Sequence, residues 1–221
     1  MTMRHFATGV GALAILATIA FAPSASASAG GPQPLPPAQA EALVGTPSLV
    51  PSSSVTRRVS PQEALAAATV AGASVSVAPG MSLAQGVGLV PTAGPAASTS
   101  SVVKPIAAAQ SSSGCAATQS GWHWGTWPYD QEITDVTYWC VLYGVSITYR
   151  STVVTASGTL CGTAWTASQL ISGGIGYTWF VTRASAGWNC PTVVPWVILH
   201  PSHYLDTAHN DWGNSDQVGT G

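Results

Sequence analysis

The densest group of side chains that could do chemistry lies near the C-terminus. Three histidines and two aspartates fall within 12 positions there, namely His200, His203, Asp206, His209 and Asp211. Such residues bind zinc or calcium, or supply a general base with an orienting carboxylate. His200, His203, His209 and Asp211 are therefore candidate metal ligands. Their spacing lacks the glutamate and register of the helical H-E-x-x-H motif, so a solvated loop in a fraying tail from Pro201 onward is the favoured interpretation.

Two other catalytic arrangements receive less support from the sequence. Asp130, Glu132 and Asp135 could supply the paired carboxylates of a glycoside hydrolase, but three acids before a strand are more typical of a solvated turn or a calcium loop. The sequence has no G-x-S-x-G nucleophile elbow. We therefore expect no catalysis and no cofactor, and keep a secreted hydrolase or metal-dependent enzyme as the second alternative.

The cysteines predict structural disulfides. The chain has four, Cys115, Cys140, Cys161 and Cys190, and no two of them form a C-x-x-C pair. Zinc-knuckle and redox motifs are therefore not supported. Four cysteines allow three connectivities. We favour Cys115–Cys140 with Cys161–Cys190, because each bond would join a flank of the domain to a neighbouring strand.

The tryptophans suggest a binding surface. All nine lie between Cys115 and the C-terminus, and Trp122, Trp124 and Trp127 sit close together. An indole offers a sugar ring a wide apolar face and a polar edge. With Tyr129, these three residues are the candidate ligand-binding group of a carbohydrate-binding module. Because large aromatic side chains dominate protein interiors, most of the nine indoles are expected in the core.

The strands that must position these residues centre on 136–150. This stretch packs β-branched and aromatic residues more densely than any other, and Gly144 interrupts it, which indicates a hairpin turn or a bulge. Cys140 lies in mid-strand, so one disulfide is expected to anchor this strand from inside. Further strands are predicted over 121–127, 155–161, 176–183 and 192–200, and a short helix over 164–171.

The fold class that follows is mainly β. We predict a small disulfide-stabilised antiparallel β-sandwich or barrel-like domain over 115–221, preceded by a mostly disordered spacer with short helical pieces. The spacer, 30–114, is rich in Ala, Ser, Pro and Val and has no aromatic residue or cysteine. Its helical pieces are predicted at 37–44 and 60–72, the second with a Ser60–Glu63 capping box.

Residues 1–29 have the order of a secretory signal peptide. Arg4 and His5 precede the uncharged apolar run 7–22, and small residues lead to a cleavage point near Ala29. The apolar run is shorter than the roughly 20 residues of a spanning helix, and no later segment is long and apolar enough, so no transmembrane segment is expected in the mature chain. The predicted localisation is secreted or extracellular.

Charge narrows the possible partners. Only 6% of the residues are charged, and the region from Cys115 onward has two arginines against six acids. Nucleic-acid binding needs a basic surface to neutralise phosphates, so that class is excluded. The sequence therefore predicts a secreted, non-catalytic binding or structural β-domain, whose partner is a cell-wall or extracellular glycan or another surface protein.

Overall fold

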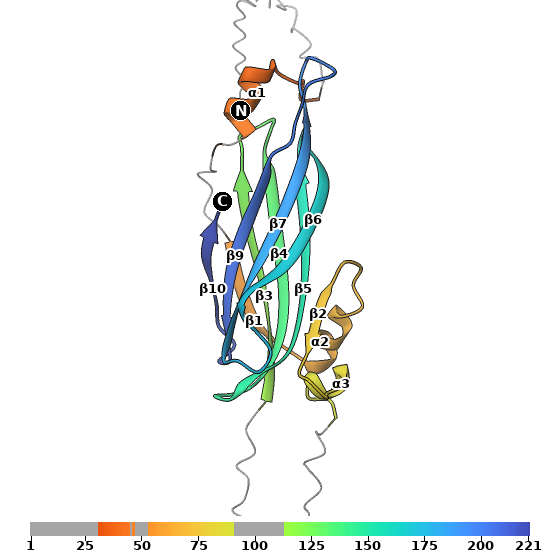
Figure 1. Cartoon of the computed structure of the whole chain (residues 1–221), viewed down its shortest axis with the longest axis vertical. Helices are drawn as coiled ribbons and strands as arrows, with labels where there is room; N and C mark the ends of the chain where they lie inside the picture. Colours follow the sequence, from red (N-terminus) through yellow and green to blue (C-terminus); the bar gives the residue numbers. More distant parts are fainter. Residues whose placement is uncertain (1–30, 45, 47–52, 91–112) are drawn as a thin grey trace, which may run out of the picture. The chain divides into compact units, whose positions relative to one another are not determined.

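A computed structural model of the chain describes residues 31–44, 46, 53–90 and 113–221, and the described residues from Pro32 onward belong to one compact unit (Figure 1). The predicted signal peptide and its cleavage point lie outside the described residues. No helix in the described part is long and apolar enough to cross a membrane. The elements are α1 (Pro37–Val44), β1 (Ser53–Val59), α2 (Pro61–Ala67), β2 (Ser74–Val77), α3 (Leu83–Gly86), β3 (Ser113–Trp124), β4 (Gln131–Leu142), β5 (Ser146–Gly158), β6 (Gly162–Gly173), β7 (Trp179–Pro191), β8 (Ile198–Leu199), β9 (Ser202–Asn210) and β10 (Ser215–Thr220).

The strands form two antiparallel sheets, as the sequence predicts. Sheet A has the order β1-β3-β4-β5-β2, and sheet B has the order β10-β9-β7-β6 with β8 paired to the end of β7. Neither sheet closes on itself among the described strands, so the fold is a sandwich and the barrel-like alternative does not apply. Thr118 of sheet A and Ser215 of sheet B are joined by a side-chain hydrogen bond of 2.7 Å.

The predicted central stretch 136–150 covers the end of β4 and the start of β5, and side chains alternate between the two faces along β4. Ile133, Asp135, Thr137 and Trp139 are buried on the face that meets sheet B, while Tyr138 and Cys140 lie on the opposite face. Gly144 adopts φ 69° in the β4–β5 turn, which only glycine adopts readily, so the interruption at this position is a hairpin turn. A bulge also occurs, between Cys140 and Val141.

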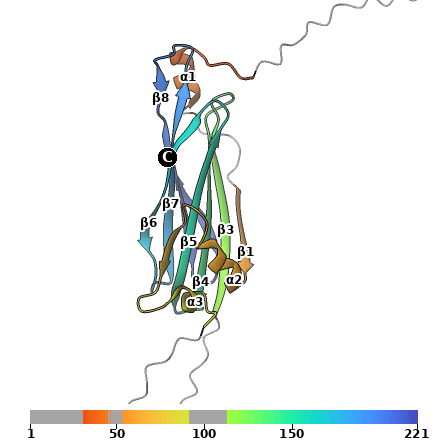
Figure 2. The same cartoon turned by 90° about the vertical axis from the view of Figure 1, so that its right-hand side faces the viewer.

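Both disulfides pair as predicted. Cys115 and Cys140 are directly opposite residues on β3 and β4, and Cys161 bonds to Cys190 at the other end of the domain. One positional expectation is wrong, because Cys140 lies on the outer face of sheet A and not between the sheets. The disulfide is nevertheless buried, since α2 and α3 lie over this part of the face and Ala64 and Val87 pack against it (Figure 2).

The segment assigned to the spacer contributes more structure than its composition indicates. Helix α1 has the predicted bounds, and α2 begins at the Ser60 cap, whose side chain accepts a hydrogen bond from the backbone N–H of Glu63. The Glu63 carboxylate binds Arg57 and does not complete the capping box. The strands β1 and β2 were not expected. They pair along the edges of sheet A through backbone hydrogen bonds, which require no aromatic side chains.

Three predictions for the C-terminal half differ from the structure. Residues 164–171 form part of β6 and not a helix, because pairing with β7 outweighs the local helix propensity. Gly173, the last residue of β6, and Gly174 after it both adopt positive φ. Residues after Pro201 form β9 and β10 and not a loop, since β9 pairs with β7 along its whole length. The predicted strand over 192–200 is reduced to β8, two residues long.

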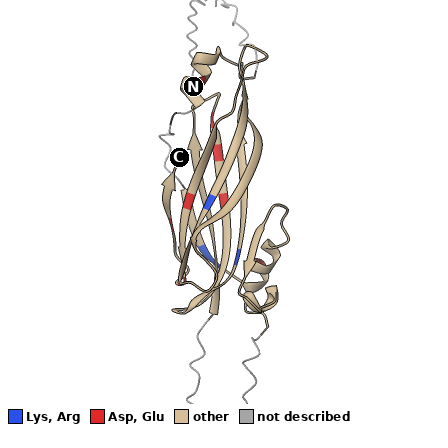
Figure 3. Ribbon diagram, in the orientation of Figure 1, with Lys and Arg blue, Asp and Glu red and all other residues tan. Residues whose placement is uncertain are grey.

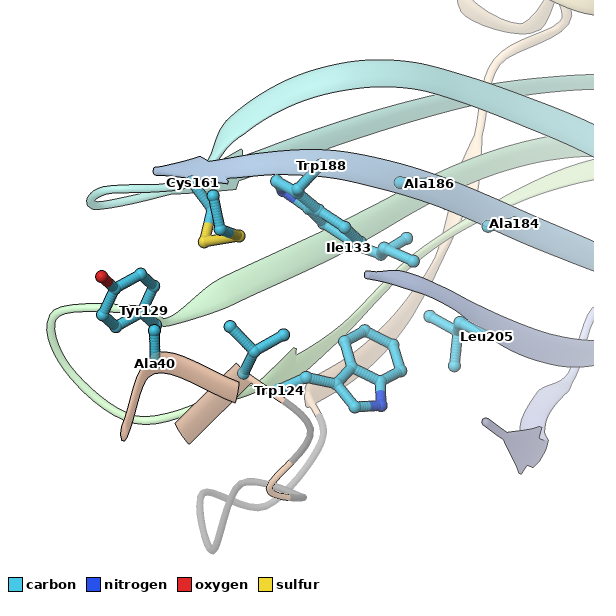
Figure 4. Close-up of a cluster of buried hydrophobic side chains, with 11 residues drawn as sticks. Ala40, Trp124, Tyr129, Ile133, Cys161, Ala184, Ala186, Trp188 and Leu205 are labelled. Carbon is cyan, nitrogen blue, oxygen red and sulfur yellow. A yellow bond between two sulfur atoms is a disulfide. The ribbon is translucent and has the colours of Figure 1, made fainter. Parts of the chain in front are cut away.

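The interior at one end of the sandwich is apolar. Trp124, Tyr129, Ile133, Trp188 and Leu205 are buried there beside the Cys161–Cys190 disulfide (Figure 4). Helix α1 closes this end by packing Ala40 and Val44 onto the same cluster. Burial of such side chains is the main favourable term in folding. A residue range taken for spacer thus supplies part of the core.

Candidate functional site

The candidate site is the outer face of sheet B, turned away from sheet A. Along β7, even-numbered residues such as Phe180, Thr182 and Ala184 are buried, so odd-numbered residues face outward. The register places three outward pairs of β7 and β9 in succession: Trp179 with Asn210, Val181 with Ala208, and Arg183 with Asp206. We use the name "outer face of sheet B" for this surface with its flanking residues Trp165, Tyr204 and Asp216.

A pocket of about 370 Å³ opens at one end of this face. Its lining consists of Trp179, Ala208, His209, Asn210, Asn214, Ser215 and Asp216. The Trp179 side chain is 43% exposed and supplies the planar wall, while amide, hydroxyl and carboxylate groups supply a polar rim. The Asn210 Oδ1 accepts hydrogen bonds of 3.0 Å from the backbone N–H groups of Trp212 and Asn214, which fixes the turn at the rim.

The centre of the face holds an ion pair on an aromatic ring. The Arg183 Nε and Nη2 donate hydrogen bonds of 2.8 and 2.7 Å to the two carboxylate oxygens of Asp206. The guanidinium lies 4.0 Å from the ring centroid of Tyr204. Hydrogen bonding to Asp206 raises the pKa of Arg183, so this group stays cationic. A two-point pair of this kind holds both side chains in one geometry.

A second indole lies toward the other end of the face. Trp165 of β6 is 49% exposed and extends over Gly187 of β7. A methyl group at position 187 would collide with the indole Nε1, so the missing side chain of Gly187 makes room for the ring. The face therefore presents Trp179 and Trp165 at its two ends, with the Arg183–Asp206 pair between them.

The predicted group of aromatic residues is mostly core. Trp124 and Tyr129 are buried and Trp122 is half-buried, whereas Trp127 is 70% exposed. Trp122 and Trp124 share one face of β3, as expected, but that face is the interior of the sandwich. Tyr129 has a structural role, because its hydroxyl accepts from the Leu35 N–H and donates to the Pro191 carbonyl. Of the predicted set, only Trp127 lies on the surface.

The histidines near the C-terminus do not converge. His203 stacks on Trp124 at 4.7 Å, and His209 lies farther along β9 against Trp139 and Phe180. His200 is exposed and pairs with Asn189. In the described part of the chain, no three His, Cys, Asp or Glu side chains are grouped so as to hold a metal ion. The structure therefore does not bring these three histidines together with Asp211, which is buried.

A buried polar layer crosses the interior between the apolar cluster around Trp124 and Trp188 and a second one around Trp139 and Phe180. Asp135 accepts hydrogen bonds from Thr137 at 3.1 Å and from Thr182 at 3.4 Å, and the Thr182 hydroxyl also lies 3.3 Å from His209 Nε2. Burial raises the pKa of Asp135 to about 7, although its hydrogen bonds and the charge of Arg150 oppose the shift. Burial, with the same arginine, lowers the pKa of His209 to about 3. Asp135 and Thr182 are buried, and His209 is only 2% exposed although it lines the pocket beside Trp179, so we assign this layer to stability.

Sequence patterns do not predict a binding site on the outer face of sheet B, because four different strands contribute to it. Its one local signal is the alternation in 179–188, which places Trp179, Arg183 and Gly187 on the same side. Charged residues offered little further guidance, since the sheets carry few of them (Figure 3). Comparisons of the chain with protein-family models, with curated proteins and with solved structures found no match.

Proposed function

We propose that this chain is a secreted, non-catalytic binding domain that takes an extracellular glycan on the outer face of sheet B. The observation that carries the proposal is the pocket beside Trp179, where one exposed indole forms a wall and Asn210, Asn214 and Asp216 form the rim. Sugar rings stack on such indoles through their apolar C–H faces, while their hydroxyls exchange hydrogen bonds with amides and carboxylates.

Export is part of the same proposal. The basic, apolar and small-residue order of 1–29 supports it, and the two disulfides are compatible with an oxidising compartment. A domain outside the cell meets cell-wall and extracellular polysaccharides, which matches the chemistry of the pocket.

The geometry favours binding over hydrolysis. Glycoside hydrolysis uses two carboxylates on either side of the scissile bond. The pocket lining contains one carboxylate, Asp216. Both oxygens of the nearby Asp206 accept hydrogen bonds from Arg183, so this carboxylate is already engaged.

The experiment that tests this proposal is depletion of the full chain by insoluble chitin, cellulose and peptidoglycan. We expect at least one matrix to retain the protein, and we expect Trp179→Ala to abolish retention because it removes the pocket wall. Trp127→Ala is the matched control, since it deletes an indole that is more exposed and lies elsewhere.

Circular dichroism of each variant establishes that it is folded. Retention that is lost in Trp127→Ala and kept in Trp179→Ala would move the site to the predicted aromatic group and refute the proposal. No retention on any matrix would leave a protein-binding or structural role.

A further inference from the structure

We propose that the outer face of sheet B binds an extended, uncharged polysaccharide chain along β7, from the pocket at Trp179 to the indole of Trp165, and not a single terminal sugar. This inference rests on the proposed function and specifies the class of glycan. It comes from the spacing of the two indoles, from the polar groups between them and from the charges of the face.

The spacing excludes a single ring as the common ligand of both indoles. Trp179 is the first residue of β7, and Trp165 lies over Gly187, eight positions farther along the same strand. At about 3.3 Å per residue, the two sites are about 26 Å apart along β7. One sugar ring cannot contact both, whereas a linear chain that follows the strand can.

The surface between the indoles is suited to the middle of such a chain. Arg183 lies four positions from Trp179 along β7, Asp206 lies opposite it on β9, and the ring of Tyr204 packs against the guanidinium. The side chains of Arg183 and Asp206 are already held in one geometry. They can therefore form hydrogen bonds with the hydroxyl groups of a sugar at little further cost in side-chain entropy. The flanking β6 strand is 12 residues long and has no charged residue, so no charge on that side interrupts the path.

The charges of the face favour a neutral polymer. The four strands of sheet B carry one arginine, Arg183, and two aspartates, Asp206 and Asp216. Since Asp206 neutralises Arg183, the remaining charge is the exposed carboxylate of Asp216 at the pocket rim. Polyuronates would meet like charge there and should bind less tightly than uncharged glucans or chitin.

Calorimetric titration of the full chain with chito- and cello-oligosaccharides, from disaccharide to hexasaccharide, tests the inference. We expect the affinity to rise with length until both indoles are covered. Trp165→Ala should lower the affinity for the hexasaccharide about tenfold, as expected for one well-packed aromatic contact, and leave that for the disaccharide unchanged. Gly187→Ala keeps the indole but displaces it, so it should reproduce the loss for the long ligand alone.

The outcomes separate this inference from the proposed function. Equal affinities for short and long oligosaccharides, abolished by Trp179→Ala, would refute the extended site while the glycan-binding function stands. The extended site is also refuted if Trp165→Ala weakens short and long ligands by the same factor or has no effect on either. Absence of binding by every oligosaccharide and every insoluble matrix would refute both.

Discussion

Asp135 and His209 are both buried and titrate in opposite senses. Single substitutions at these two positions should therefore change the pH dependence of stability in opposite directions. Asp135 has a pKa of about 7 in the folded chain against an ordinary 3.8, so between these values the folded state holds a proton that the unfolded state releases. Stability from this group therefore falls as the pH rises through that window. His209 has a pKa of about 3 against an ordinary 6.5, so below pH 6.5 the unfolded state takes up a proton and stability falls as the pH drops.

The two windows overlap between about pH 4 and 6.5, where the slopes oppose each other. Each fully titrating group contributes about 1.4 kcal/mol per pH unit to the free energy of unfolding, so the two contributions nearly cancel in the native chain. Asp135→Asn removes one of them, and its stability relative to the native chain should rise by about 3 kcal/mol from pH 4 to 6.5. His209→Gln removes the other and should lose about as much over the same range.

Urea unfolding at several pH values, with the disulfides intact, measures these differences. The matched comparison is the double variant Asp135→Asn, His209→Gln, which should again follow the profile of the native chain. The charge of Arg150 acts on both groups, and it is present in all four proteins. Differences between each single variant and the native chain that do not change with pH would refute the assignment of buried, oppositely shifted groups.

Two further predictions concern the core and the second disulfide. Trp124→Ala should destabilise the chain by about 3–5 kcal/mol because the indole is buried beside α1. Trp127→Ala, at an exposed indole, should change stability by about 0.5 kcal/mol or less. Equal losses of stability in thermal unfolding would contradict this difference in packing. Replacing Cys161 and Cys190 together by Ser opens a loop with a sequence separation of 29 and should cost about 3.5 kcal/mol in the chain-entropy account. Urea unfolding measures this loss of stability. A loss under about 1 kcal/mol would contradict the view that the disulfide stabilises the fold by constraining the unfolded chain.

Local signals in the sequence predicted the parts of the fold that local chemistry determines. The hairpin at Gly144 and the cap at Ser60 depend on residues adjacent in the chain. The disulfide pairing was inferred from the order of strands, because each cysteine pair joins segments that are close in sequence.

Pairing between distant segments decided the rest. Residues 164–171 have a composition that suits a helix, yet they form a strand because they pair with β7. The C-terminal residues of β9 form a strand for the same reason, since they also pair with β7. Edge strand β1 contributes backbone hydrogen bonds to sheet A and buries little side-chain surface, so hydrophobic patterning gave no sign of it. Propensity is a weak guide where tertiary pairing competes with it.

The candidate site was missed for a related reason. Aromatic residues close in sequence, such as Trp122 and Trp124, turned out to share the buried face of β3. The exposed indoles of Trp165 and Trp179 are 14 positions apart in the sequence, and they lie on the same face only because of the register of β6 and β7. Tryptophans that are close in sequence therefore lie mostly in the core, whereas the pairing of strands brings the exposed tryptophans to one face.

The most direct test of glycan binding on the outer face of sheet B is the set of indole N–H resonances in the nuclear magnetic resonance spectrum of the full chain. Its nine tryptophans provide one reporter each, assigned by single substitution. On titration with cello- or chito-hexasaccharide, the signals of Trp179 and Trp165 should shift together, while those of Trp127, Trp196 and the buried Trp139 stay in place. Shifts centred on Trp127 or Trp196, with Trp179 unaffected, would contradict the account.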